Sequence, residues 1–185
     1  MSRFVNPSNS AFQASLNSEI YVDKTGLIAY TNKVLGSTQA FICNTRPRRF
    51  GKSIAANMLA AYYSKGCDSK EMFGHLKIAG YDSFETYLNK YDVLHFDVQW
   101  FMTSLKGPGS IVQRIEACLI REMLEIYPEF IVPYEFTLAE LLSRIHTKTN
   151  KQFVIIIDEW DMLIRDESAN QTLKDEYIEF FKKSV

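Results

Sequence analysis

The stretch Arg46-Pro-Arg-Arg-Phe-Gly51-Lys52-Ser53 separates the apolar run Gln39-Ala-Phe-Ile-Cys43 from a segment that continues to about Ser64. The short apolar run predicts a buried strand. The segment that starts at Gly51 carries apolar residues at spacings of three and four, which predicts an amphipathic helix. A strand, a basic loop and a helix that opens with Gly-Lys-Ser therefore follow one another, and this order decides the fold prediction.

The loop matches the end of the phosphate-loop pattern G-x-x-x-x-G-K-[ST], which occurs in the same strand–loop–helix context. Gly51, Lys52 and Ser53 match, and Arg46 stands where the pattern has its first glycine. Backbone N–H groups at such a helix start bind phosphate oxygens. We expect Gly51 to allow close approach of the backbone, Lys52 to reach the β- and γ-phosphates, and Ser53 to offer its hydroxyl to Mg²⁺.

The missing first glycine changes the loop, because Pro47 fixes its own φ and lacks an N–H donor. Arginine binds phosphate through two parallel hydrogen bonds, so the arginines of the loop can compensate with charge. The alternative interpretation is a solvated basic loop before an ordinary helix. The predicted phosphate-binding set is Arg46, Arg48, Arg49, Phe50, Gly51, Lys52 and Ser53.

Two acids follow the most apolar run of the chain, Gln152-Phe-Val-Ile-Ile-Ile157. This run predicts the central strand of a parallel sheet covered on both faces. A carboxylate at such a strand end can hold Mg²⁺, and we expect Asp158 to do so. The next carboxylate, Glu159, can activate a water molecule. The alternative is a polar loop whose acids cap the next element, and a structural role is also the expectation for Asp161.

The remaining periodicities predict a strand near 92–97 and helices near 110–126, 137–146 and 170–183. Strands that alternate with helices predict an α/β fold, in which ligands bind beyond the carboxyl ends of the strands. The loops after Cys43 and Ile157 would then be neighbours. We expect residues 1–19 to be a flexible arm and residues 20–185 to be one domain of three α/β/α layers with a mostly parallel sheet.

Composition narrows the functional classes. The 185 residues are 46% hydrophobic with a net charge of −1, so a protein that coats nucleic acid is not indicated. Three scattered cysteines, Cys43, Cys67 and Cys118, argue against a disulfide framework. No apolar run approaches the roughly 18 residues of a membrane span. The sequence thus predicts a cytoplasmic protein.

Other candidate residues carry weaker predictions. Asp97 closes the second predicted strand, where it could assist a metal or a water molecule, or cap the following helix. His75, His95 and His146 have no metal-ligand spacing, so we expect structural or surface roles for them.

Together, these motifs resemble those of the bacterial AAA-ATPase-like ("predicted AAA-ATPase") family. The resemblance rests on Tyr21-Val-Asp-Lys-Thr25, on the loop that ends in Gly-Lys-Ser, and on Ile157-Asp-Glu-Trp-Asp161, and it spans roughly residues 18–165. Trp160 stands where the family usually has tyrosine. The resemblance implies ATP binding with Mg²⁺ and hydrolysis in the full-length form, and members of the family often carry a restriction-endonuclease-like domain downstream. The expected partner is therefore either a second copy of the chain or such a downstream domain.

The family's sheet order implies that a later strand lies between the phosphate-loop strand and the strand before Asp158. We therefore expect the chain to be truncated at its C-terminus. Two other functions remain open: an inactive interaction module that keeps the fold, and a nucleotide kinase that transfers phosphate to a small acceptor. An ATPase is favoured over an inactive interaction module by the intact Lys52, Ser53, Asp158 and Glu159. It is favoured over a nucleotide kinase by an acidic pair that could act on water.

Overall fold

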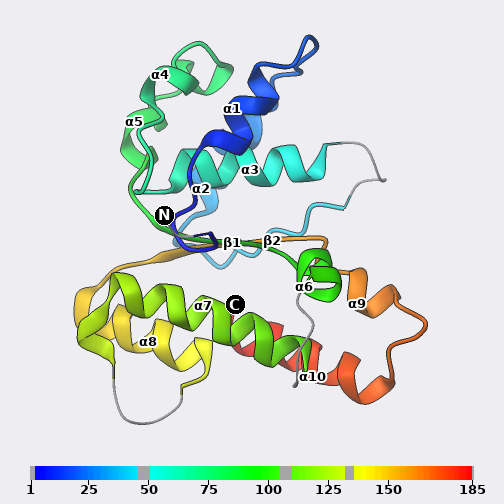
Figure 1. Ribbon diagram of the computed structural model, residues 1–185. Coiled ribbons are helices and arrows are strands. Elements are labelled where there is room, and N and C mark those ends of the chain that lie inside the picture. The colour runs from blue at the N-terminus through cyan, green and yellow to red at the C-terminus, as the bar shows by residue number, and fades with distance from the viewer. Residues whose placement is uncertain (1–2, 46–50, 105–109, 132–135, 185) are drawn as a thin grey trace. The chain divides into compact units, whose positions relative to one another are not determined.

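The computed structural model describes residues 3–45, 51–104, 110–131 and 136–184, and the chain divides into two compact units (Figure 1). The N-terminal unit is Asn6–Val93, and the C-terminal unit joins residues 3–5 to Leu94–Val185. Helices combine with a small parallel sheet, which confirms the predicted α/β class. Within the described ranges, no helix is long and apolar enough to cross a membrane.

Six short helices build the N-terminal unit around an aromatic core. They are α1 (Ser10–Leu16), α2 (Gly26–Val34), α3 (Lys52–Tyr63), α4 (Lys70–Phe73), the 3₁₀ helix η1 (Lys77–Gly80) and α5 (Phe84–Tyr87). Phe73 stacks on Phe12 at 5.2 Å between ring centroids and meets Tyr62 edge-on at 5.3 Å. All three rings are buried, and such pairs add stability beyond the area that they bury.

Buried hydrogen bonds fix α2 and the end of α3. The Tyr63 hydroxyl donates to Asn32 Oδ1 at 2.7 Å, and the Tyr62 hydroxyl donates to the Phe84 carbonyl at 2.7 Å. Asn89 adopts a left-handed φ of 54°, and its amide donates to the Ser64 carbonyl at 2.8 Å. Because these groups are buried polar atoms with partners, they hold the helix that carries Lys52 in one place.

The predicted strand at 39–43 is wrong. Residues 40–45 have no regular secondary structure, and Phe41 and Ile42 are 69% and 41% exposed. A strand is stable only when its backbone groups pair with a neighbour. The sheet in the described part of the chain has two strands, neither of which comes from this segment, so its apolar pattern alone does not make it a strand.

The C-terminal unit builds its helices around a two-stranded sheet of order β1-β2. Its elements are β1 (Asp92–Asp97, of which the first two residues belong to the N-terminal unit), α6 (Val98–Ser104), α7 (Ile111–Ile126), the 3₁₀ helix η2 (Pro128–Phe130), α8 (Leu138–Thr149), β2 (Phe153–Asp158), α9 (Met162–Arg165) and α10 (Gln171–Ser184). In Figure 1, α7, α8 and α10 lie on one side of this sheet.

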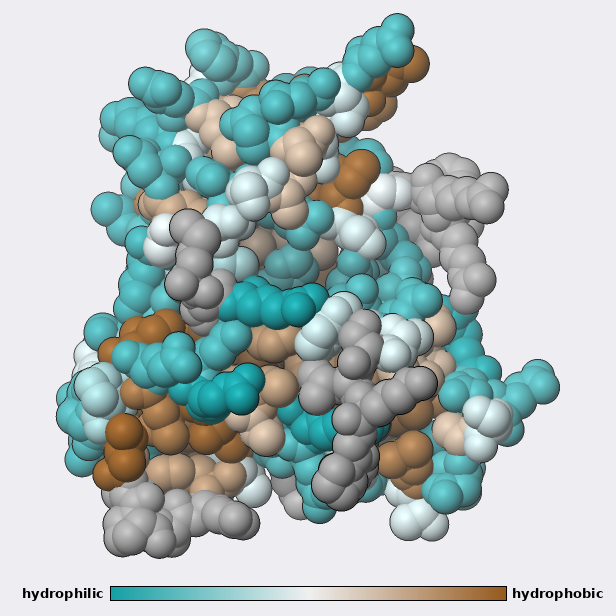
Figure 2. Space-filling view, viewed as in Figure 1, coloured by the Kyte–Doolittle hydropathy of each residue, from teal (hydrophilic) through white to brown (hydrophobic). Residues whose placement is uncertain are grey.

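Three helices of the C-terminal unit, α7, α8 and α10, begin within one residue of the predicted starts. Ser110 and Thr137 each form a capping box, with Gln113 and Glu140 as the reciprocal partners. Buried residues recur along α7 at the spacing of one helix face, among them Ile111, Ile115, Leu119 and Met123. Figure 2 shows hydrophobic residues reaching the surface over the α7 and α8 part of this unit.

Strand β2 differs from its prediction in burial. Every residue from Phe153 to Asp158 is only partly buried, whereas the sequence predicts a strand covered on both faces. In the described part of the chain, β2 pairs with β1 alone, so it is an edge strand. The six-residue strand itself is confirmed, with the acidic pair at its carboxyl end.

The polar N-terminal stretch contains more structure than an arm. Phe4, Val5 and Phe12 are buried, and residues 10–16 form α1. The buried carboxylate of Glu122 accepts hydrogen bonds from the backbone amides of Phe4 at 2.7 Å and Val5 at 2.9 Å. A side chain of α7 thus holds this segment against the C-terminal unit.

Candidate functional site

The helix α3 begins at a glycine with a left-handed backbone. Gly51 is the N-cap residue, and its φ of 75° and ψ of 35° are left-handed. An L-residue other than glycine is strained in this region. Lys52 and Ser53 follow as the first two residues of a 12-residue helix. The first amides of a helix have no acceptor within it, so they can bind an anion.

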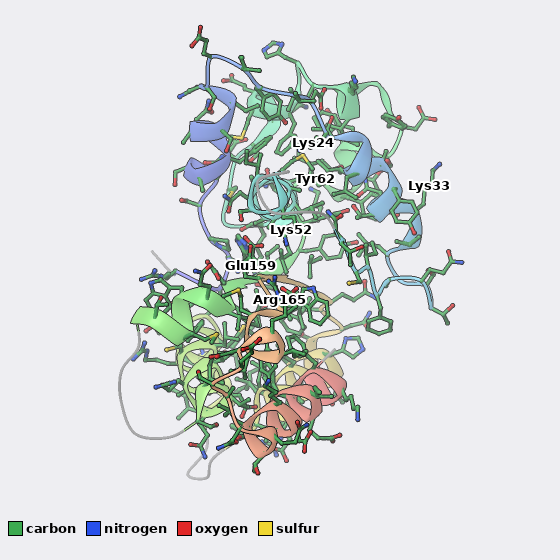
Figure 3. All side chains as sticks on the ribbon, turned by 90° about the vertical axis from the view of Figure 1, so that its right-hand side faces the viewer. Lys24, Lys33, Lys52, Tyr62, Glu159 and Arg165 are labelled. Atoms are coloured by element: carbon green, nitrogen blue, oxygen red, sulfur yellow. The ribbon has the colours of Figure 1, made fainter. Side chains whose placement is uncertain are left out.

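The other predicted residues of the loop, Arg46, Arg48, Arg49 and Phe50, lie outside the described residues. Lys52 is partly buried and Ser53 is exposed, both in the N-terminal unit. Figure 3 labels Lys52 in this unit together with Lys24 and Lys33 of the α2 region. In the structure, the Gly-Lys-Ser end of the loop pattern therefore forms the beginning of a helix, with Gly51 as its N-cap.

A cavity of about 360 Å³ lies at this helix start. Its described lining comes from the α2 region, from the irregular segment before residue 46, from the start of α3 and from η1: Asp23, Lys24, Gly26, Leu27, Asn44, Gly51, Ala55 and Lys77. A Cβ atom at position 51 would lie 2.7 Å from Lys24 Nζ, so this ammonium group lies against Gly51. The sequence interpretation missed Lys24 and Lys77, although Lys24 belongs to the Tyr21-Val-Asp-Lys-Thr25 run on which the family resemblance rests.

Asp23 links the residues just before α2 to the helix η1 through hydrogen bonds. Its Oδ1 accepts hydrogen bonds from the amide and hydroxyl of Thr25 at 2.8 and 2.7 Å, and its Oδ2 accepts one from the amide of Lys77 at 2.8 Å. Burial opposes ionisation of Asp23, but the hydrogen bonds from Lys77 and Thr25 outweigh it and lower the carboxyl pKa. Asp23 is therefore a fixed anion at the edge of the cavity.

The acidic pair lies at the end of β2 in the C-terminal unit. Asp158 is the last residue of the strand, and its Oδ1 accepts a hydrogen bond from the Glu159 amide at 3.0 Å. Glu159 has a φ of 51°, a left-handed conformation that is uncommon for a residue other than glycine. Strained backbone of this kind concentrates at functional sites. The carboxylate of Glu159 is 19% exposed, so water can reach it.

Arg165 of α9 pairs with both acids that follow Asp158. Its guanidinium lies 3.7 Å from Glu159 Oε2 and 2.9 Å from Asp161 Oδ2, and Figure 3 labels Glu159 and Arg165 close together. Asp161 also begins α9, since it is the N-cap residue. This arrangement agrees with the structural role expected of Asp161.

Tyr177 of α10 fixes the middle of the acidic loop. Its buried hydroxyl donates a hydrogen bond to the Trp160 carbonyl at 2.7 Å. Burial raises the pKa of Tyr177, and the nearby charge of Asp161 adds to this shift, so the hydroxyl remains protonated. No local pattern in the sequence indicates this contact, because 17 residues separate the two partners.

Asp97 and His95 have structural contacts at the end of β1. Asp97 Oδ1 accepts hydrogen bonds from the amides of Gln99 at 2.8 Å and Trp100 at 3.3 Å, which is the geometry of a helix cap. Burial lowers the pKa of His95, whereas the carboxylates of Asp158 and Asp97 act in the opposite direction. Of the two roles expected for Asp97, the structure shows capping.

The described residues contain no group of three or more histidine, cysteine, aspartate or glutamate side chains that could hold a metal ion by themselves. Mg²⁺ typically uses one or two carboxylates together with phosphate oxygens and waters. Asp158 and the Ser53 hydroxyl are oxygen donors of the suitable kind, so the donor chemistry fits Mg²⁺ bound with a nucleotide. Ser53 belongs to the N-terminal unit and Asp158 to the C-terminal unit.

An α/β chain with a glycine-initiated Gly-Lys-Ser helix and an acidic pair after an apolar strand has the features of the nucleotide-binding class of α/β proteins. The family model described as Predicted AAA-ATPase matches residues 11–184. The chain belongs to this AAA-ATPase-like family. Comparison with curated proteins and with solved structures finds no match.

Proposed function

We propose that this protein binds ATP with Mg²⁺ and hydrolyses it. The observation that supports the proposal is the left-handed Gly51, which lines a cavity and begins the helix whose first two residues are Lys52 and Ser53. Family membership independently supports nucleotide binding. Arg46, Arg48, Arg49 and Phe50 complete the proposed phosphate-binding set.

Each group at the helix start has a proposed task. The first-turn amides of α3 and the ammonium group of Lys52 bind phosphate oxygens, and they stabilise charge that builds up during phosphoryl transfer. The Ser53 hydroxyl and the Asp158 carboxylate are each proposed as an oxygen ligand that Mg²⁺ would take. When bound, Mg²⁺ neutralises charge on the β- and γ-phosphates.

Glu159 is the proposed general base. Its carboxylate accepts a proton from the attacking water, and the left-handed backbone at this residue sets the direction in which the side chain leaves the strand end. Arg165 and Tyr177 restrict the loop around it through Glu159, Asp161 and Trp160. A base held in this way can activate water without first being ordered.

Calorimetry with ATP, with and without Mg²⁺, tests the binding step. Lys52→Ala should weaken binding at least tenfold, because a charge-assisted hydrogen bond contributes about 1.5–3 kcal/mol. Lys33→Ala is the matched control, since Lys33 is an exposed lysine in the last turn of α2. Equal affinities for the wild type and Lys52→Ala would contradict the phosphate-loop assignment.

The hydrolysis step is tested separately. Glu159→Gln should keep ATP affinity and lose turnover, because the amide keeps the shape of the side chain but cannot accept the proton. Asp158→Ala should weaken only the Mg²⁺-dependent part of binding. If the wild type binds ATP without hydrolysing it, the protein is a nucleotide-binding module. If it does not bind ATP, the alternative of an interaction module is favoured.

A further inference from the structure

Lys24 is the charged side chain that the proposed function leaves unexplained. It comes from the turn before α2, 27 positions before Gly51, yet its ammonium group occupies the space beside the Gly51 Cα atom. Both residues line the same cavity. Because the amides of a phosphate loop bind the anion directly, a cation against its glycine lies within reach of the same anion.

The backbone on both sides of Lys24 is fixed. Asp23 accepts hydrogen bonds from Thr25 and from the Lys77 amide, and Thr25 is fully buried. The Thr25 hydroxyl also accepts a hydrogen bond from the Ile78 amide at 3.1 Å. A lysine on a fixed turn loses less conformational freedom when it binds a ligand than one on a loose loop, which favours a positioned contact.

The charges of the cavity also favour an anion. Among the described residues, its charged lining is Lys24, Lys77 and Asp23, two positive and one negative, for a sum of +1. Lys52 adds a further positive charge at the start of α3. The Asp23 carboxylate accepts three hydrogen bonds, through which it holds η1 to the turn before α2.

We propose that Lys24 is a second phosphate-binding lysine, which contacts the polyphosphate chain of the nucleotide held by Gly51, Lys52 and Ser53. This inference rests on the proposed function and adds a residue to it from outside the phosphate loop. Because Lys24 contacts phosphate oxygens, it should contribute as much to the binding of inorganic polyphosphate as to the binding of a nucleotide.

The test compares Lys24→Met and Lys24→Gln with the wild type by calorimetry, with ATP and with inorganic tripolyphosphate as ligands. Both variants should lose about tenfold in affinity for both ligands, the expected effect of a lost charge-assisted contact. The difference from the wild type should shrink as salt is raised, since the contact is electrostatic. Lys33→Met, on the same helix region, should bind as the wild type does (Figure 3).

Three outcomes separate the two proposals. If Lys52→Ala weakens binding while both folded Lys24 variants bind as the wild type does, the Lys24 inference is wrong and the proposed function stands. If the Lys24 variants lose affinity for ATP but not for tripolyphosphate, Lys24 contacts another part of the nucleotide, and the inference is again wrong. If the wild type binds neither ligand, both proposals fail. Circular dichroism establishes that each variant is folded. If Lys24→Met does not fold, Lys24→Gln, which keeps a polar side-chain end, still provides the test.

Discussion

Arg165 Nη2 lies 3.7 Å from Glu159 Oε2, so the proposed general base is paired with a cation from the helix that follows it. The same guanidinium binds Asp161 more closely, at 2.9 Å. Arg165 is therefore anchored by Asp161 and presents one edge to Glu159. This arrangement orients the Glu159 carboxylate and leaves it accessible to water.

Replacing Arg165 with alanine should lower ATP turnover about fivefold to tenfold and leave ATP affinity unchanged. The reason is that Glu159 would lose its orienting partner, and misplacement of a reacting group reduces the rate without affecting phosphate contacts. Steady-state ATPase assays and calorimetry measure the two effects. The matched control is Lys182→Ala, which breaks the exposed pair with Glu179 at 2.9 Å and should change neither quantity. A drop in affinity equal to the drop in turnover would contradict an orienting role.

Replacing Gly51 with alanine should weaken ATP binding at least tenfold and destabilise the fold by about 1–2 kcal/mol. The φ of 75° is costly for an L-residue, and the new Cβ would displace the ammonium group of Lys24. Calorimetry and urea unfolding report the two effects. Gly80→Ala is the control, because no atom lies within 4 Å of a Cβ there and its φ is not positive. Wild-type affinity in Gly51→Ala would show that this glycine is dispensable for binding.

Replacing Tyr177 with phenylalanine should reduce the free energy of unfolding by about 1–3 kcal/mol. The substitution removes the donor to the Trp160 carbonyl and leaves that acceptor without its bond to the hydroxyl. Urea unfolding followed by circular dichroism measures the change. Tyr30→Phe is the control, since Tyr30 is 51% exposed and should tolerate the change. Equal losses in both variants would mean that the Tyr177 hydroxyl has no special structural role.

The acid stability of the protein should depend on Asp23. Its pKa is lower in the folded than in the unfolded chain, so its stabilising effect is present above the unfolded value of about 3.9 and is lost as pH falls through the folded pKa. Asp23→Asn should therefore destabilise the protein near neutral pH and narrow its gap to the wild type below pH ~4. Thermal unfolding between pH 7 and pH 3 measures this. A gap that stays constant over this range would contradict the assignment.

Local signals in the sequence predicted the four longest helices of the described residues, α3, α7, α8 and α10. The caps at Ser110 and Thr137 depend on residues three positions apart, and the buried face of α7 depends on helical spacing, so neither needs knowledge of the rest of the fold. The strands at 92–97 and 153–158 were predicted to within one residue at each end. At position 51 the motif indicated a glycine for close approach of the backbone, whereas the left-handed φ of 75° was not predicted.

The failures involve contacts that are distant in sequence. Phe41 and Ile42 have the composition of a strand, but a strand exists only when another segment pairs with it, and no local pattern reports that partner. The approach of Lys24 to Gly51 likewise depends on how α2 and η1 pack near α3. The pair of Asp161 with Arg165 could have been predicted from its spacing of four residues, whereas the added contact to Glu159 could not.

The left-handed backbone of Glu159 sets stability against activity at a single residue. Glycine or asparagine would relax this conformation, by about 1–2 kcal/mol for glycine, and both would remove the proposed base. Selection for stability alone would therefore replace Glu159, and only selection for turnover would retain it. In a library of variants sorted first for folding and then for ATP hydrolysis, position 159 should reverse its preferred residue between the two rounds.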